Sequence, residues 1–314
     1  MAHYSSEHGM TDVSPHRETS AFNLTADLVT SLRPDQWTKN LIVFAGLVFG
    51  GQLMEPTSVF RAAGAFGAFC ALSSAMYLVN DLGDRRADRL HPVKAKRPIA
   101  AGRISSGVAI GAVVVLLALG LGAGFVLNPM LGGLSLLFVA LLTLYSRLLK
   151  HMVVLDVLTI AVGFVLRAVA GAVAVGVPSS QWLLVCTLLG ALFLGLTKRR
   201  QEVDALGEHA TEHRPALGRY SVQGLDQMVT IVAGATVLSY AVYTTDPNTI
   251  ATFGTDLLTL TIPFPVYGVL RYLLIMREHP LASPSDLLLR DRGLAWCAVG
   301  WSVAVALIIY RPLG

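Results

Sequence analysis

Long apolar runs separated by short polar segments dominate the chain from residue 41 onward. Most of the runs are unbroken and long enough for an α-helix to cross the roughly 30 Å apolar layer of a membrane. A β-barrel would instead need short segments in which polar and apolar residues alternate. The pattern predicts nine membrane-spanning helices, at Leu41–Leu53, Phe60–Val79, Val108–Leu127, Leu131–Tyr145, Val153–Val175, Trp182–Leu196, Met228–Tyr243, Leu257–Ile275 and Leu294–Tyr310.

The composition agrees with an all-α integral membrane protein. Hydrophobic residues make up 54% of the chain and charged residues only 14%, against about 25% charged in a soluble domain. The polar residues 1–30 predict a disordered segment, followed by a single transmembrane domain over residues 31–314. The three cysteines, Cys70, Cys186 and Cys297, lie within apolar runs and are interpreted as small core residues.

The basic residues predict the orientation of the chain. All but three of the 24 Lys and Arg residues lie in segments that alternate to the same side of the nine predicted spans, the exceptions being Arg61, Arg167 and Arg311. Basic loops remain in the cytoplasm, so the N-terminus and the chemistry are expected on the cytoplasmic face of the plasma membrane. The net charge of +4 follows from this bias and gives no argument for nucleic-acid binding.

An acidic cluster follows the second predicted span, in Asn80-Asp81-Leu82-Gly83-Asp84-Arg85-Arg86-Ala87-Asp88. On one continuous helix, Asp81, Asp84 and Asp88 would fall within about 60° of one another. Three carboxylates on one face repel unless a hard cation lies between them and a phosphate-bearing substrate, which favours Mg²⁺. The alternative is a solvated acidic turn at the end of a helix.

A basic loop follows at once and presents Lys94, Lys96 and Arg97 between two prolines. Carboxylates and cations in one short segment predict a site for a metal–pyrophosphate complex, with the acids on the metal and the bases on the phosphate oxygens. Topological bias alone would also explain these cations, although it would not explain why they adjoin three acids.

A second polar cluster, Lys198-Arg199-Arg200-Gln201-Glu202, follows the sixth predicted span. One acid among three bases indicates an anion site with a helper carboxylate. The alternative is a structural pair, because Lys198 and Glu202 are four residues apart on a helix.

The fifth predicted span contains two charges, Asp156 near its start and Arg167 eleven residues further, on nearly the same helical face. A charge this deep in a membrane is costly and is usually functional or paired. Arg167 could neutralise a lipid phosphate or be linked to Asp156 through intermediate groups. Lys39, Asn40 and Tyr145 are further candidates for the same pocket.

These motifs resemble the UbiA superfamily of intramembrane prenyltransferases, in the first acidic motif and in the His91-Pro92 and Arg97-Pro98 pairs that follow it. That superfamily normally carries a second aspartate-rich motif where this chain has Lys198 to Glu202. The sequence of this chain at that position, Lys198-Arg199-Arg200-x-Glu202, resembles one branch of the superfamily, the decaprenyl-phosphate phosphoribosyltransferases. Three further motifs also resemble that branch: Arg33-Pro34-x-Gln36-Trp37-x-Lys39-Asn40, Gly163-Phe164-Val165-Leu166-Arg167 and Ser285-Asp286-Leu287-Leu288-Leu289-Arg290-Asp291-Arg292.

The resemblance implies a UbiA-like bundle that transfers 5-phosphoribose from phosphoribosyl pyrophosphate to a polyprenyl (decaprenyl) phosphate and releases pyrophosphate, for cell-wall arabinan. It implies Mg²⁺ on Asp81 and Asp84 with support from Asp88, and a carboxylate such as Asp156 or Glu202 near the reacting sugar. The substrate-binding residues that it implies are Lys39, Asn80, Asp88, Lys94, Lys96, Arg97, Tyr145, Arg167, Lys198, Arg199 and Arg200.

Two other functions remain open at this point. An aromatic prenyltransferase with a polyprenyl diphosphate donor would share Asp81 and Asp84 but would favour acids at the second site. A transporter could use deep polar residues, but the chain shows no inverted repeat. Whether the protein forms a homo-oligomer is also left open.

Overall fold

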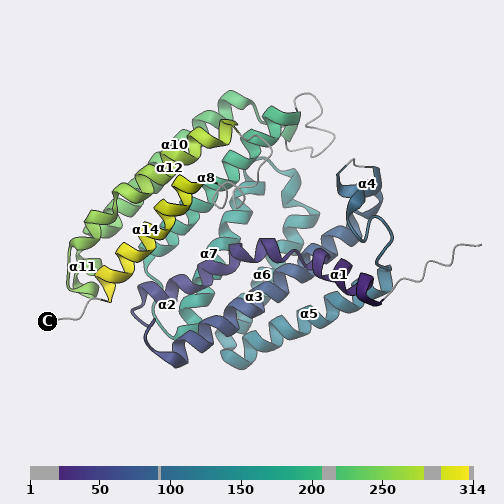
Figure 1. The fold of residues 1–314 in the computed structure, drawn as a ribbon, viewed down its shortest axis with the longest axis horizontal. Helices are drawn as coiled ribbons and strands as arrows, with labels where there is room; N and C mark the ends of the chain where they lie inside the picture. The colour runs from purple at the N-terminus through teal and green to yellow at the C-terminus, as the bar shows by residue number, and fades with distance from the viewer. Residues whose placement is uncertain (1–20, 91–92, 207–216, 279–290, 311–314) are drawn as a thin grey trace, which may run out of the picture.

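The computed structural model describes residues 21–90, 93–206, 217–278 and 291–310, and every regular element within these ranges is a helix (Figure 1). In this part of the chain, eight helical segments are long and apolar enough to cross a membrane. This confirms the prediction of an all-α integral membrane protein. The eight segments correspond to α3 Pro56–Gly83, α5 Ser106–Leu127, α6 Pro129–Arg147, α7 Leu155–Val175, α8 Gln181–Leu206, α10 Val222–Thr245, η6 Leu257–Thr261 continuing into α12 Pro263–Glu278, and α14 Arg292–Ile309.

The first predicted span is not among these eight helices, so the predicted count of nine is not confirmed. Its residues belong to a 3₁₀-helix, η1 Pro34–Phe44, and a short helix, α2 Ala45–Phe49. A 3₁₀-helix of eleven residues is unusually long, because the side chains at i and i+3 eclipse one another. The polar residues before Leu41 belong to this 3₁₀-helix and pack against α3 and α7, where Trp37 bonds Ser74 and Asn40 bonds Arg167.

Other boundaries also differ from the predicted ones. The helix α1 Ala21–Leu32 lies within the segment predicted to be disordered, of which residues 1–20 lie outside the described ranges. Helix α8 extends beyond Leu196 to Leu206 and carries the second polar cluster on its final turns. The remaining short elements are α4 Arg85–Leu90, η2 Lys94–Lys96, η3 Leu149–His151, η5 Leu217–Arg219 and α11 Pro247–Phe253.

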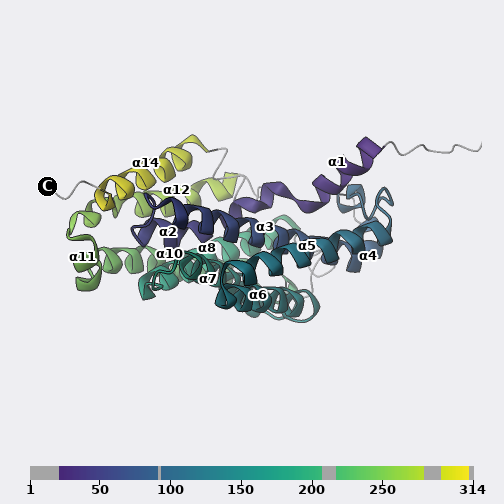
Figure 2. The ribbon, with the colours of Figure 1, turned by 90° about the horizontal axis from the view of Figure 1, so that it is seen from below.

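Two apolar cores hold the bundle together, and α7 contributes to both. One core joins α7 to α8, α10, α12 and α14 around side chains such as Phe193 and Tyr272. The other joins α7 to η1, α3 and α6 around Phe69 and Phe138. The two groups of helices lie on opposite sides of Figure 1, and α4 and α11 lie at opposite ends of the molecule in Figure 2.

The backbones of η1 and α2 touch that of α7 where two glycines remove the side chain. A Cβ atom on Gly171 would lie 1.9 Å from the carbonyl oxygen of Val43, and one on Gly46 would lie 2.6 Å from Cα of Ala172. No other residue fits at such distances without displacing the backbone. These contacts hold η1 and α2 directly against the C-terminal part of α7.

Candidate active site

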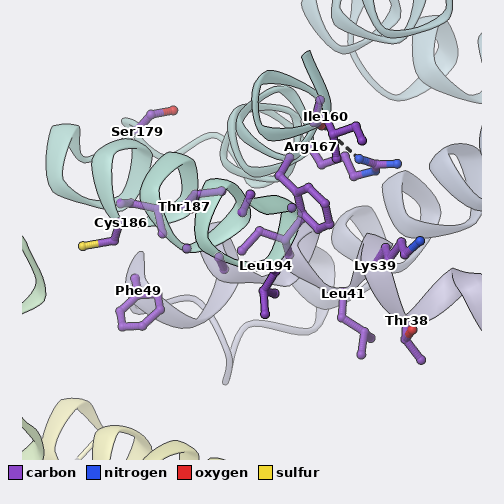
Figure 3. Close-up of a pocket in the computed structure, with 18 of the residues that line it drawn as sticks. Thr38, Lys39, Leu41, Phe49, Ile160, Arg167, Ser179, Cys186, Thr187 and Leu194 are labelled. Carbon is purple, nitrogen blue, oxygen red and sulfur yellow. Dashed lines mark hydrogen bonds between the residues drawn. The ribbon is translucent and has the colours of Figure 1, made fainter. Parts of the chain in front are cut away.

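A cavity of about 1560 Å³ lies between the two groups of helices. Its lining runs from Arg97 in the loop after α4 to Thr249 in α11, near the other end of the molecule. Figure 3 shows Lys39 and Arg167 toward one end of this cavity, and Phe49 and Cys186 toward the other. The cavity therefore combines a basic end with a largely apolar, aromatic end.

The structure brings together about half of the predicted site residues. Those that line the cavity are Lys39, Asn80, Arg97, Tyr145, Arg167, Lys198, Arg199 and Glu202. Those outside its lining are Asp81, Asp84, Asp88, Lys94, Lys96, Asp156 and Arg200. His91, Pro92 and the motif from Ser285 to Arg290 lie outside the described residues.

Asp81 and Asp88 are buried behind the basic end of the cavity and share one arginine. Nη1 of Arg97 donates to Oδ1 of Asp81 at 3.1 Å and to Oδ2 of Asp88 at 2.7 Å. Nη2 of Arg33 donates to the same Asp81 oxygen at 2.6 Å. The two carboxylates thus lie close together and hold two cavity-lining arginines in place.

Asp84 does not join this pair. Helix α3 ends at Gly83 and α4 begins at Arg85, so the three carboxylates do not share the single helical face that the sequence predicted. The Asp84 side chain is 48% exposed, and its Oδ1 lies 3.6 Å from Nζ of Lys150.

Among the described residues, no group of three or more carboxylates, histidines or cysteines is arranged to hold a metal ion. The metal role of the acidic motif therefore stays a prediction. Mg²⁺ is commonly bound by one or two carboxylates and completes its shell with water and substrate phosphates. The carboxylates of Asp81 and Asp88 are oxygen ligands of the type that Mg²⁺ prefers, and both would have to release Arg97 to hold such an ion.

Arg199 is 4% exposed and is held by two carboxylates. Its Nε donates to Oδ2 of Asp156 at 2.7 Å, and its Nη1 donates to Glu202. The hydroxyl of Tyr220 donates to the other oxygen of Asp156 at 2.9 Å. Glu202 therefore pairs with Arg199, its neighbour one turn earlier on α8.

The geometry changes the role expected of Asp156. Its carboxylate is fully buried and lies behind Arg199, outside the cavity lining. Burial, reinforced by the charge of Asp156, raises the pKa of Tyr220 to about 12. The Tyr220 hydroxyl thus stays protonated and can donate to the carboxylate throughout the neutral range. Asp156 positions Arg199, which itself lines the cavity.

Arg200 points to a different environment. Its guanidinium bonds Asp204 at 2.8 Å and Asp226 at 3.1 Å, outside the cavity. Neighbouring residues on a helix face different directions, which explains why Lys198 and Arg199 reach the cavity when Arg200 does not.

Arg167 lies in the middle of α7 and is 7% exposed. Its Nε donates to Oδ1 of Asn40 at 2.7 Å, and its Nη1 donates to the carbonyl of Gly163 at 3.1 Å. The guanidinium lies 4.5 Å from the ring centroid of Phe138 and 5.2 Å from that of Phe164. The predicted link to Asp156 is not found, because Arg199 and Tyr220 hold that carboxylate.

Lys39 is close enough to Lys198, Arg167 and Arg33 to feel their charges. Burial lowers the pKa of Lys39 to about 8, and the positive charges of Lys198, Arg167 and Arg33 add to this effect, while Asp35 opposes it. Like charges at this spacing repel, and a bound anion would relieve that repulsion.

Arg33 and Tyr220 were missed as site residues by sequence reasoning, and Asn40, considered as a residue that could face the pocket, is buried outside its lining. Arg33 lines the cavity, bonds Asp81 and lies 4.9 Å from the ring centroid of Tyr77. Asn40 holds Arg167, and Tyr220 holds Asp156. Arg33 and Asn40 stand in the lead-in motif, which was the available signal, but their partners are distant in sequence.

Comparison with known proteins agrees with this arrangement. The model of the UbiA prenyltransferase family matches residues 40–290. The chain belongs to the UbiA prenyltransferase family. This UbiA family member is 34% identical to a decaprenyl-phosphate phosphoribosyltransferase of Corynebacterium glutamicum, over 92% of this chain and 88% of that protein. It is 33% identical to the protein of the same name from Mycobacterium tuberculosis, over 90% of this chain and 94% of that one.

The fold is likewise that of solved UbiA structures. A UbiA homolog from Archaeoglobus fulgidus bound to GPP and Mg²⁺ superposes with a TM-score of 0.68, covering 90% of this chain and 96% of that one at 19% identity. The UbiA-like bundle predicted from the sequence is confirmed.

Proposed function

We propose that this UbiA family member transfers 5-phosphoribose from phosphoribosyl pyrophosphate to a polyprenyl phosphate, releasing pyrophosphate. The relatives named decaprenyl-phosphate phosphoribosyltransferase, similar over nearly the whole chain, support this reaction. Decaprenyl phosphate is the proposed acceptor, and a precursor of cell-wall arabinan is the proposed use of the product.

The observation that carries the proposal is the charge of the cavity. Six cations line it, namely Arg33, Lys39, Arg97, Arg167, Lys198 and Arg199. Phosphoribosyl pyrophosphate has phosphate groups at both ends of the sugar, so it needs cations in two places. Arg33 and Arg97 at one edge and Lys198 on α8 would provide them.

The chemistry needs few protein groups. An oxygen of the lipid phosphate attacks the anomeric carbon, and the bond to pyrophosphate breaks with its electron pair leaving on pyrophosphate. The phosphate is already anionic, so no strong general base is required. The Glu202 carboxylate, held by Arg199 at the cavity wall, would stabilise positive charge on the sugar ring. A Mg²⁺ ion on Asp81 and Asp88 would neutralise the leaving pyrophosphate.

An aromatic prenyltransferase is the second candidate, because the matched family is named for prenyl transfer. The direct test offers the purified protein labelled phosphoribosyl pyrophosphate with a short polyprenyl phosphate, and in parallel a prenyl diphosphate with an aromatic acceptor. Label transfer to the lipid phosphate supports the proposal. Turnover of the prenyl diphosphate alone contradicts it.

Replacing Asp81 tests the acidic motif within the same assay. Asp81→Asn should abolish turnover and leave the protein folded in detergent, because it removes one of the paired carboxylates. Asp226→Asn is the matched control, since Asp226 pairs with Arg200 outside the cavity. Near-normal turnover in Asp81→Asn with unchanged Mg²⁺ dependence would exclude the metal role.

We also propose that the protein lies in the plasma membrane and that the basic end of its cavity is on the cytoplasmic side. Ala101 and Asn248 are exposed and lie in segments at opposite ends of the bundle. Cysteines introduced at these positions should react with a membrane-impermeant reagent from opposite sides. Labelling of both from one side would contradict the topology.

A further inference from the structure

Arg167 and its neutral partner Asn40 form a buried pair that the proposed reaction leaves without a specific ligand. We propose that Arg167, held in place by Asn40, is the subsite for the phosphate monoester of the lipid acceptor. This inference rests on the proposed function and assigns one of its two substrates to particular residues.

The first argument is charge. Within the described residues, Arg167 has no carboxylate within ion-pair distance, and it contacts an amide oxygen, a peptide carbonyl and two aromatic rings. These groups orient the guanidinium without cancelling its charge. A buried cation of this kind is costly unless an anion completes it.

The second argument is depth. Arg199 contacts Asp156 in the first turn of α7, and Arg167 lies eleven residues further along the same helix. At 1.5 Å per residue the two levels are about 16 Å apart. Lys39 interacts electrostatically with both Lys198 and Arg167, so the cations continue from the outer level to the deep one.

The third argument is the wall around Arg167. Leu142, Ile160, Phe164 and Leu194 line the cavity, Phe164 contacts the guanidinium, and Ile160 lies beside Arg167 in Figure 3. The donor carries sugar hydroxyls and several phosphates, which apolar walls cannot satisfy. A phosphate attached directly to a hydrocarbon chain suits a single cation surrounded by apolar side chains, with the chain continuing toward Phe49 and Trp301.

Asn40 is the positioning residue of this subsite. It is fully buried, its Oδ1 accepts from Arg167 and from Ser73 at 3.4 Å, and its Nδ2 donates to Sγ of Cys70 at 3.3 Å. Its backbone belongs to the η1 segment that the glycine contacts fix against α7. A neutral amide at this position leaves the positive charge of Arg167 for a ligand.

The test changes only the charge of the partner. Asn40→Asp keeps the size of the side chain and its bond to Arg167, but it supplies the anion that the lipid would otherwise supply. Asn128→Asp is the matched control, because Asn128 caps α6 outside the cavity and aspartate caps equally well. Arg167→Gln is a second variant, which removes the cation itself.

Two measurements are made on each protein in detergent: the KM of both substrates, and direct binding of a short polyprenyl phosphate without donor, compared with the corresponding polyprenol. Asn40→Asp and Arg167→Gln should each weaken the binding of the polyprenyl phosphate by about ten- to a hundredfold, the effect of losing one charge-assisted contact. The KM of phosphoribosyl pyrophosphate and the affinity for the polyprenol should stay within about threefold, and Asn128→Asp should match the unchanged protein.

The possible results distinguish a failure of the Arg167 subsite from a failure of the proposed function. Unchanged lipid affinity in Asn40→Asp and Arg167→Gln, or a selective loss of donor affinity, overturns the subsite while phosphoribosyl transfer stands. If the unchanged protein transfers no phosphoribose, the proposed function fails, and the binding measurement alone decides the subsite. Loss of polyprenyl phosphate binding in both variants would then support it, and retained binding would overturn it.

Discussion

The two buried arginines of this bundle, Arg199 on α8 and Arg167 on α7, have opposite surroundings. Arg199 bonds two carboxylates, and Arg167 bonds an amide, a carbonyl and the faces of two rings. Both are almost completely buried. The difference indicates that similar burial of the same side chain can serve two purposes, because acidic partners fix a cation and neutral partners keep its charge for a ligand.

Removing an acidic partner should have the largest effect and sharpen this comparison. Asp156→Ala leaves Arg199 with one carboxylate and the Tyr220 hydroxyl with no acceptor, so we expect a loss of about 3–5 kcal/mol in the free energy of unfolding. Asn40→Ala should cost less, about 1–3 kcal/mol, because only neutral hydrogen-bond partners are lost. Thermal unfolding of both variants in detergent measures the difference, and equal destabilisation would break the comparison.

The neighbours of Arg199 should differ strongly in their effect on the donor. Lys198→Ala should raise the KM for phosphoribosyl pyrophosphate about ten- to a hundredfold, since Lys198 lines the cavity. Arg200→Ala should change it by less than about twofold, because its partners Asp204 and Asp226 lie outside the cavity. The reverse order, measured by initial rates, would mean that the wrong face of α8 was assigned to the substrate.

The pH dependence of kcat/KM tests whether Lys39, which interacts with both Lys198 and Arg167, binds an anionic substrate. Lys39 binds an anion in its protonated form, so affinity is present below its pKa of about 8 and is lost as the pH rises through that value. The charged groups that face it are Lys198, Arg167, Arg33 and Asp35. We expect kcat/KM to fall above about pH 8, and Lys39→Arg to remove this fall because arginine stays protonated. The same fall in both proteins would assign the titration to another group.

The smallest expected effect concerns the hydroxyl behind Asp156. Tyr220→Phe leaves a buried carboxylate oxygen and the amide of Val154 without this partner, and we expect a loss of about 1–2 kcal/mol. Tyr272→Phe is the control from the same core, since its hydroxyl has only a 3.5 Å contact to Thr197. Equal stability of the two variants in detergent would show that Tyr220 contributes nothing to the Arg199 network.

The sequence predicted the elements whose cause is local. Apolar runs located all eight membrane-crossing helices, because a continuous run of this length has few alternatives. The depth of Arg167 within such a run also marked it correctly as a residue that lines the cavity. The break after Gly83 was missed, since the spacing of the acids suits a continuous helix.

Partners across long separations could not be predicted. Arg167 and Asn40 are 127 residues apart, and Asp156 and Tyr220 are 64 apart. Only the packing of η1 and of the segment after α8 brings them together. The position of Asp156 behind Arg199 could not be predicted for this reason, because the sequence shows a carboxylate near the site and not the side chain that encloses it.

The 3₁₀ geometry of η1 has a consequence for which changes of length this segment can tolerate. With three residues per turn, Trp37, Asn40, Val43 and the following Gly46 form one row that packs on α3 and α7, and the residues of the other two rows, except Phe44, line the cavity. Inserting one residue between Arg33 and Lys39 would move the ammonium group of Lys39 against Arg167 and the amide of Asn40 into the cavity. Deleting one residue would instead bring the apolar side chain of Leu41 against Arg167. Related chains should therefore vary in side chains along the two cavity rows but keep the number of residues in this segment constant.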